Sequence, residues 1–568
     1  MNTIYKYLKD YKKESILGPL FKLLEASFEL VVPLIIAAII DNGIPSGNTG
    51  YIGSMCALLA LLAVVGFACS VTAQYFSAKA ACGFGTKLRH ALFAKIQSLS
   101  FTELDTVGTG TLITRMTGDI NQVQSTLNIV LRLFLRSPFI VFGAMIMAFT
   151  IDFRSALVFA VTIAVLSAAV FGIMLGSVPL YKKVQSSLDK ITALTSENLE
   201  GVRVIRAFCN EESEKEKYGA ANSVLNAAQR LAGSVSALLN PVTYIMLNVA
   251  VTVLIYVGAV RVDGGAISQG MVVALYNYMS QILVELIKLA GFIINISKST
   301  ASMARIDDVL SLTPSVADGT AEDGASSEFA VEMENVSLKY KGAGAPSLED
   351  INLKVKKGET VGIIGSTGCG KSSLVNLIPR FYDAQSGTVR VDGVDVKQYQ
   401  IDALRKKTGV VMQKNVLFKG TIRENLLWGN PNATEDDINS AIDAAQARDI
   451  INAKPDGIDS EVEQGGTNFS GGQRQRLTIA RALVRKPKIL ILDDSSSALD
   501  YATDARLRGA IKNLGYKTTV FIVSQRTASI RHADKIVVLD DGKICGIGTH
   551  DSLLESCPVY REIHMSQQ

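Results

Sequence analysis

The chain has 568 residues, of which 48% are apolar and 19% are charged, and its formal net charge is only +4. The apolar residues concentrate before residue 300, in uncharged runs that approach the roughly 20 residues needed to span a bilayer. No long basic tract is present, and such a tract would be expected of a nucleic-acid-binding protein. The composition therefore predicts a membrane protein and argues against nucleic acid as a partner.

Six apolar segments have the length of membrane-spanning helices. The basic N-terminal stretch is followed by a long apolar run without a small-residue cleavage signal, which predicts a retained first span. These patterns predict a multi-pass protein of the cell membrane, embedded in the lipid bilayer. The predicted spans cover residues 16–40, 52–76, 134–151, 156–178, 242–260 and 271–296.

Two long segments, one before the third span and one before the fifth, hold many basic residues, among them Lys87, Arg115, Lys182 and Arg206. By the positive-inside rule, both segments and both termini are cytoplasmic. Each segment has roughly 55 to 65 residues and is rich in helix formers, which predicts a helical hairpin rather than a loop. A hairpin arm of about 27 residues would project roughly 40 Å beyond the bilayer.

The composition changes after Arg305, where a stretch rich in Ser, Asp, Gly and Ala predicts a linker. Beyond it, short β-rich runs alternate with helical stretches, the pattern of an α/β domain around a largely parallel sheet. The predicted domains are a six-helix membrane domain at residues 1–310, a linker at 311–328 and a nucleotide-binding domain at 329–568. The seven cysteines show neither metal-ligand spacing nor a disulfide framework, so no structural metal site is predicted.

The stretch GSTGCGKS, residues 365–372, matches a phosphate-binding loop and stands between a predicted strand and a predicted helix. Glycines there let backbone N–H groups turn toward phosphate oxygens. Lys371 is predicted to neutralise the β and γ phosphates of ATP, and Ser372 to offer its hydroxyl to Mg²⁺. The predicted nucleotide-binding residues of this loop are Gly365, Ser366, Thr367, Gly368, Cys369, Gly370, Lys371, Ser372 and Ser373.

The run ILILDD, residues 489–494, reads as a buried strand that delivers two carboxylates at its C-terminal end. Asp493 is predicted as the partner of Mg²⁺, through a water molecule, and Asp494 stands where a catalytic base would be. A buried strand followed by a plain acidic turn is the alternative for this run taken alone.

The stretch NFSGGQRQRL, residues 468–477, closely resembles the signature of ABC transporters, with Phe469 where the family usually has Leu. The resemblance implies a membrane domain fused to an ATP-binding domain that works as half of a dimer. In the family this motif closes over ATP held by the partner domain. The residues implied to contact the partner's ATP are Ser470, Gly471, Gly472 and Gln473.

Three further positions follow the family's order. Tyr340 lies where an aromatic ring stacks on adenine, Gln413 where a glutamine senses Mg²⁺, and Asp500 where an aspartate communicates across the dimer. Taken alone, these residues would be an ordinary strand residue, a solvated loop residue and a helix cap. In the membrane half, residues 110–123 and 197–212 resemble the segments that carry the coupling helices of exporters.

Two residues depart from the family pattern, because Asp494 replaces a Glu and Gln525 replaces a His. The Asp side chain is one methylene shorter, which displaces the carboxylate by about 1 Å and can cost ~10²-fold in rate. Gln lacks the positive charge available to His. Both changes weaken hydrolysis at the chain's own ATP site and spare nucleotide binding there. The signature, which would complete the partner's site, is intact.

This combination resembles the degenerate-site subunit of heterodimeric bacterial multidrug ABC exporters. It implies an ABC-type ATPase that exports small hydrophobic or amphipathic compounds, with weak hydrolysis at its own ATP site. The second half-transporter would then carry the missing Glu and His. A homodimeric lipid or peptide exporter that hydrolyses with Asp494 is one alternative. An ATP-gated regulatory or channel-like subunit is another.

Charged residues inside predicted spans bear on the cargo. Glu25 and Glu29 share one face of the first span, and Glu285 lies in the sixth. They would line a polar cavity for cationic or amphipathic cargo, or they would be neutralised by Lys22 and Lys288 at i,i+3 spacing. The spacing favours structural salt pairing.

Overall fold

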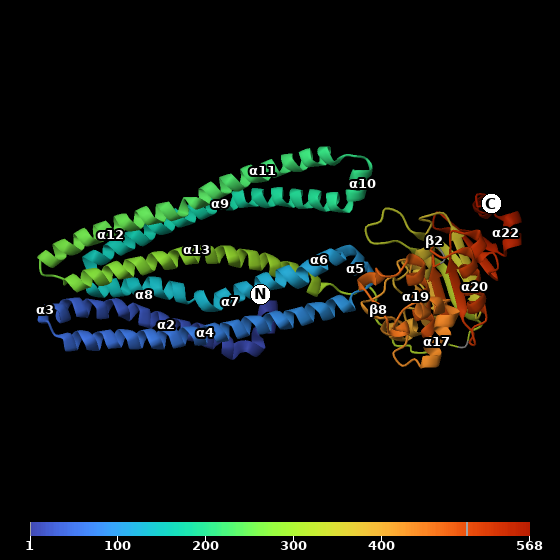
Figure 1. Ribbon diagram of the computed structural model, residues 1–568, viewed down its shortest axis with the longest axis horizontal. Coiled ribbons are helices and arrows are strands. Elements are labelled where there is room, and N and C mark those ends of the chain that lie inside the picture. Colours follow the sequence, from blue (N-terminus) through green and yellow to red (C-terminus); the bar gives the residue numbers. More distant parts are fainter. Residues whose placement is uncertain (1, 326, 496–497, 568) are drawn as a thin grey trace. The chain divides into compact units, whose positions relative to one another are not determined.

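The computed structural model describes residues 2–325, 327–495 and 498–567 (Figure 1). The chain divides into two compact units. The helical unit comprises Met1–Ile96 and Gly110–Ser311, and the sheet unit comprises Gln97–Thr109 and Leu312–Gln568. The predicted linker includes Ser326, which lies outside the described residues.

Within the residues that the structure describes, the helical unit contains six helices that are long and apolar enough to cross a membrane, which confirms the prediction of six spans. In each, less than a third of the most apolar 18-residue window is buried, as expected when lipid covers the rest. They are Thr3–Ser46, Thr49–Ser98, Thr109–Ile151, Phe153–Glu200, Glu211–Asp263 and Gln269–Ser311. Their main parts are α2 (Lys12–Ala38), α4 (Thr49–Ser98), α7 (Ile120–Leu133), α8 (Arg136–Ile151), α9 (Phe153–Glu200), α11 (Glu211–Ala237), α12 (Leu239–Asp263) and α13 (Gln269–Ser311).

Each spanning helix continues well beyond the length of a bilayer. The helices α9 and α11 run side by side and are joined by the short helix α10 (Val202–Ala207), so the second long segment is a helical hairpin (Figure 1). The first long segment holds α5 (Phe101–Val107) and α6 (Thr109–Thr114) at its turn. Residues 97–109, with α5, group with the sheet unit.

The sheet unit is built on a six-stranded sheet in the order β12-β11-β3-β10-β9-β6, parallel except for the edge strand β12. An antiparallel sheet in the order β2-β1-β4-β5 accompanies it. The larger sheet comprises β3 (Thr360–Gly365), β6 (Thr408–Val411), β9 (Ile489–Asp493), β10 (Thr519–Val523), β11 (Lys535–Asp540) and β12 (Lys543–Gly548). The smaller one comprises β1 (Phe329–Leu338), β2 (Leu348–Lys356), β4 (Ser386–Val391) and β5 (Val394–Asp395), and a separate pair joins β7 (Gly420–Thr421) to β8 (Glu461–Val462).

The parallel strands are buried on both faces, which explains their continuous apolar runs. Along β9, Ile489 and Ile491 pack into one hydrophobic core, whereas Leu490 and Leu492 pack into the other. The helices of this unit are α14 (Lys371–Asn376), α15 (Ile401–Lys407), α16 (Ile422–Leu427), α17 (Glu435–Ala444), α18 (Arg448–Asn452), α19 (Gly471–Val484), α20 (Tyr501–Lys512), α21 (Thr527–Ile530), α22 (His550–Ser556) and α23 (Pro558–Met565). The fold is therefore an α-helical membrane domain fused to an α/β domain, as predicted.

The stretch after α13 is bound to the sheet unit by backbone hydrogen bonds. The amides of Thr320 and Ala321 both donate to the carbonyl of Gln398 at 2.8 Å, and the amide of Gly319 donates to that of Tyr399 at 3.0 Å. Residues 319–321 of the segment predicted as a linker are thus held against this unit.

Candidate nucleotide-binding site

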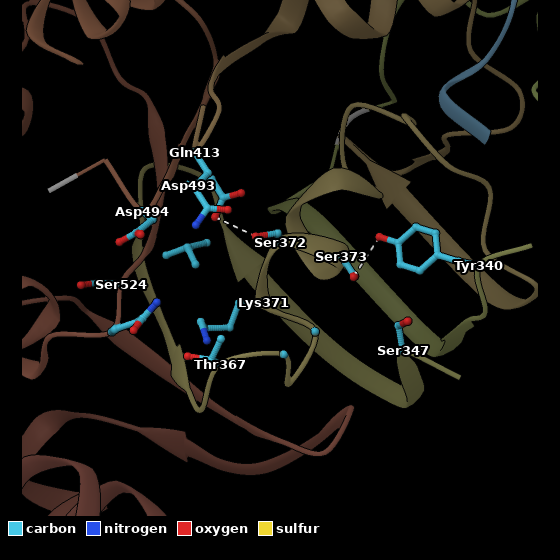
Figure 2. A pocket seen from close by; sticks show the side chains of 14 residues that line it. Tyr340, Ser347, Thr367, Lys371, Ser372, Ser373, Gln413, Asp493, Asp494 and Ser524 are labelled. Atoms are coloured by element: carbon cyan, nitrogen blue, oxygen red, sulfur yellow. Dashed lines mark hydrogen bonds between the residues drawn. The ribbon is translucent and has the colours of Figure 1, made fainter. Parts of the chain in front are cut away.

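A cavity of about 320 Å³ lies at the C-terminal ends of β3, β9 and β10, where ligands bind in open α/β sheets (Figure 2). In Figure 2, Gln413, Asp493 and Asp494 lie at one end of the cavity and Tyr340 at the other. Its lining residues are Tyr340, Ser347, Thr367, Gly368, Gly370, Lys371, Ser372, Ser373, Gln413, Asp493, Asp494, Val523, Ser524 and Gln525. Most of the residues predicted to bind nucleotide are therefore brought together.

The predicted phosphate loop wraps around Lys371, which is only 9% exposed. Its ammonium donates to the carbonyls of Gly365 at 2.8 Å and Ser366 at 2.6 Å, so the loop holds the side chain in place. Gly370 has φ 96°, and a Cβ atom there would meet the carbonyl oxygen of Ser347 at 2.5 Å. The backbone can make this turn only with glycine at that position.

Three residues predicted for the loop do not line the cavity, namely Gly365, Ser366 and Cys369. Cys369 is 3% exposed, and its Sγ lies 3.7 Å from the ammonium of Lys371. The thiol is therefore packed behind the loop, whereas Thr367 and Gly368 face the cavity.

Oxygen donors for a divalent cation converge beside Lys371. The Ser372 hydroxyl donates to the Asp493 carboxylate at 3.0 Å, and Gln413 lines the same end of the cavity. Hydroxyl, carboxylate and amide oxygens are the ligands that Mg²⁺ prefers, usually together with substrate phosphates. Among the described residues, no group of three or more His, Cys, Asp or Glu side chains could hold a metal. The oxygen donors of Ser372, Asp493 and Gln413 fit an Mg²⁺ that is also bound by nucleotide phosphates.

The two acids at the end of β9 are withdrawn from solvent, Asp493 fully and Asp494 in part. Burial raises the pKa of Asp493 and that of Asp494, and a hydrogen bond from Gln413 partly opposes the rise at Asp494. Asp494 also has φ 51°, a left-handed backbone that Asp and Asn tolerate better than Glu. Its amide donates to the carbonyl of Val523 at 3.0 Å, which fixes the position next to β10.

Gln475 was not foreseen from the sequence. This residue of α19 is fully buried, and its amide donates to the carbonyl of Asp494 at 3.3 Å. Its oxygen accepts from the amide of Ala498 at 3.3 Å. The signature helix is thereby tied to the acid at the end of β9. No motif signals this link, because it joins backbone to a side chain 19 residues away.

The opposite end of the cavity is aromatic. The hydroxyls of Tyr340 and Ser373 share a hydrogen bond of 2.9 Å, and the Tyr340 ring meets that of Tyr382 edge-on at 5.0 Å. Tyr382 in turn donates to the Asp105 carboxylate at 2.6 Å, and Phe101 of α5 stacks on Phe381 at 4.6 Å. The predicted adenine side of the cavity is thus continuous with α5.

The signature residues lie outside this cavity. Ser470 caps α19 by accepting from the amide of Gln473 at 3.3 Å, and the Gln473 side chain accepts in return from the amide of Ser470 at 2.9 Å. Ser470 and Gly471 are exposed. A Cβ atom on Gly472 would meet the carbonyl oxygen of Ala498 at 2.8 Å. The motif is therefore a capped helix start with an exposed tip, and none of its four residues lines the chain's own cavity.

Of the two remaining predicted residues, Gln525 lines the cavity and Asp500 does not. Gln525 lines the cavity and is exposed, and its carbonyl accepts from the side chain of Gln567 at 2.6 Å. Asp500 caps α20 by accepting from the amide of Thr503 at 3.1 Å. The cap is the simpler alternative given above for Asp500, and communication across a dimer remains a prediction.

Comparison with known proteins gives matches over both units. Residues 15–286 match the family model described as the ABC transporter transmembrane region, and residues 348–497 match the one described as ABC transporter. The chain is 35% identical over 570 residues to an uncharacterized ABC transporter ATP-binding protein of Mycobacterium tuberculosis, covering 99% of this chain and 97% of that protein.

Two further relatives carry functional names. A putative multidrug export ATP-binding/permease protein of Bacillus subtilis is 31% identical, with 100% of this chain and 99% of that protein covered. An ATP-dependent lipid A-core flippase of Syntrophus aciditrophicus is 30% identical, with 84% and 80% covered. Among solved structures, a bacterial Atm1-family ABC exporter with ATP bound superposes with a TM-score of 0.80 at 23% identity, covering 97% of each chain.

Proposed function

Since the chain belongs to the ABC transporter family, we propose that it is one subunit of an ATP-driven exporter of small hydrophobic or amphipathic compounds. In this proposal it pairs with a second half-transporter in a heterodimer. Its own ATP site binds MgATP and turns it over slowly, and its signature completes the partner's site.

The observation that carries the proposal is the pairing of Asp494 and Gln525 in one cavity with Lys371 and Ser372. Lys371, Ser372 and Asp493 are suited to holding triphosphate and Mg²⁺. The shorter carboxylate of Asp494 is less suited than Glu to activating the attacking water, and Gln525 lacks the positive charge that His would offer the γ-phosphate. This composition favours binding over hydrolysis.

The placement of the signature supports a dimer. Ser470 and Gly471 are exposed and do not line the chain's own cavity. Backbone amides at the start of a helix of 14 residues are suited to a γ-phosphate, which a second subunit would have to bring. The relative named for multidrug export supports the cargo class, whereas the one named a lipid A-core flippase favours a lipid exporter as the second candidate.

The experiment compares the purified chain alone with the chain combined with a candidate partner in nanodiscs. The proposal expects slow ATP hydrolysis by the lone chain, and fast hydrolysis by the pair that survives Asp494→Asn. Asn tolerates the left-handed backbone at this position, so the substitution tests the charge alone. Asp541→Asn is the matched control, because Asp541 also has positive φ (42°) and is exposed. Fast hydrolysis by the lone chain that Asp494→Asn abolishes would overturn the proposal in favour of a homodimer.

A further inference from the structure

A second cavity lies within the helical unit, between α2, α8 and α13, and has a volume of about 460 Å³. Its polar lining includes Glu29, Arg136, Gln281, Glu285 and Lys288. Glu29, Arg136 and Glu285 lie on helices that end at Ser46, end at Ile151 and begin at Gln269, respectively. At 1.5 Å per residue, each charged residue is roughly 22 to 26 Å from that helix end. These charges are therefore within the roughly 30 Å hydrocarbon region of a bilayer.

Arg136 is the centre of a charge network in this cavity. Its guanidinium donates to Glu285 at 2.7 Å and to both carboxylate oxygens of Glu29 at 2.7 and 3.0 Å. Glu285 also accepts from Ser137 at 2.6 Å and from Lys288 at 2.9 Å. The pairing predicted for Glu285 and Lys288 is present, and Arg136 adds a second cation that the sequence pattern did not indicate.

The network leaves specific polar groups available. The side chains of Glu29 and Lys288 are 42% and 43% exposed, whereas those of Glu285 and Arg136 are 4% and 9% exposed. Nε of Arg136 and Oε1 of Gln281 are buried and have no hydrogen-bond partner among the described residues. One accessible carboxylate, one accessible ammonium and an unpaired amide oxygen thus border one space.

The charges in the cavity balance. Two carboxylates face two cations, so a ligand with a single charge would add an uncompensated charge in a medium where that is costly. A ligand that carries both signs adds none. Val32, Ile36, Ile140 and Val284 also line the cavity and offer an apolar wall.

We propose that this cavity binds a zwitterionic amphiphile, with an ammonium group beside Glu29 and Gln281 and an anionic group beside Lys288. The proposal rests on the export function above and names the cargo class for it. It replaces the simple cation considered from the sequence, because Arg136 and Lys288 already neutralise both acids.

The test measures ligand binding without nucleotide. The full-length chain in uncharged maltoside micelles is titrated with octylphosphocholine, octyltrimethylammonium or octyl sulfate, and the thermal unfolding midpoint gives an apparent Kd. We expect the zwitterion to bind at least tenfold more tightly than either singly charged probe. Equal or tighter binding of the cation or of the anion would overturn the proposal.

Charge variants sharpen the test. Glu29→Gln leaves the network with one excess positive charge and should make octyl sulfate the best ligand, whereas Lys288→Gln should make octyltrimethylammonium the best. Gln281→Leu should weaken both ammonium probes without affecting the sulfate. If the three probes keep the same order of affinity in both charge variants, the network has only a structural role and the proposed binding site is refuted.

The exposed pair Glu212 and Lys215 on α11 provides the matched controls. Glu212→Gln and Lys215→Gln change the net charge equally but should leave the order of probes unchanged. The shift of the same midpoint by MgATP is recorded on each sample. If MgATP does not shift the unfolding midpoint of the wild-type chain, that result counts against the proposed ATP-driven function, independently of the order of the probes.

Discussion

Ser372 donates a 3.0 Å hydrogen bond to the carboxylate of Asp493, joining the phosphate loop to the end of β9 across 121 residues of sequence. The bond holds two oxygen atoms that could serve a cation side by side. Because Asp493 is buried and its pKa is raised, this hydroxyl is also a partner that keeps the acid in its ionised form.

Ser372→Ala removes a cation ligand and the hydrogen bond to Asp493. We expect the affinity for MgATP to fall by roughly 10- to 100-fold, the range seen when groups that support a metal site are lost. Affinity for ATP in EDTA should change by less than about threefold. Isothermal titration under both conditions gives the two values. Ser372→Thr keeps the hydroxyl and serves as the control, and an equal loss with and without Mg²⁺ would contradict the assignment.

Gly472→Ala tests the signature. The added Cβ would lie 2.8 Å from the carbonyl oxygen of Ala498, so the first turn of α19 must shift. We expect hydrolysis by the assembled transporter to fall at least about tenfold, since misplacing such groups by 1 Å can cost ~10²-fold. Binding of nucleotide to the chain's own cavity should persist. Gly509→Ala in α20 is the control, because a Cβ there meets nothing within 4 Å. An unchanged rate of hydrolysis in Gly472→Ala would show that the signature takes no part in the reaction.

The motifs that could be predicted from the sequence are local. The phosphate loop is one run of residues, and the strand ILILD alternates between two hydrophobic cores, so pattern and chemistry coincide there. The spanning helices were also predicted, but as segments of about 18 to 26 residues, because hydropathy marks only the part inside the lipid. The helix α4, at 50 residues, continues far past the apolar run.

The contacts that could not be predicted join distant segments. Arg136 pairs with Glu29 and Glu285 across 107 and 149 residues, and Tyr382 bonds Asp105 across 277 residues. Spacing along one helix indicates only i,i+3 and i,i+4 partners, as for Lys22 and Glu25, which do pair at 2.5 Å. Long-range pairing depends on how the helices and sheets pack, which no local pattern encodes.

Tyr382→Phe tests the link between the aromatic end of the cavity and α5. The change removes the hydrogen bond to Asp105 and keeps the ring against Tyr340. Because α5 is covalently continuous with α4 and α6, we expect the stimulation of ATP hydrolysis by cargo to fall several-fold, whereas nucleotide affinity stays within about twofold. A hydrogen bond to a charged group contributes about 1.5–3 kcal/mol, and the exposure of Asp105 favours the lower end. Asp105→Ala, which removes the acceptor, should behave alike, and normal stimulation in both variants would exclude a coupling role.

We expect His550 to make the stability of the ATP-binding domain depend on pH. Burial lowers the pKa of His550, with further lowering from His564 and Arg531, while Asp551 opposes the effect. The ring is buried and shares a 2.7 Å hydrogen bond with Tyr560. The folded state therefore favours the neutral ring, and the unfolded state binds more protons near its ordinary pKa of about 6.5. The contribution of the neutral His550 ring to the free energy of unfolding should be fully present above that pKa and should be lost as the pH falls below it.

The measurement is the unfolding midpoint of the sheet unit within the full-length chain, recorded between pH 5 and 8 with and without His550→Gln. The wild-type midpoint should fall toward pH 5, and the variant should show a smaller fall, because Gln cannot take up the proton that drives unfolding. The exposed Glu435→Gln variant is a control for general charge effects. If the two pH profiles of wild type and His550→Gln are parallel, another group is responsible for the acid sensitivity, and the buried ring contributes packing alone.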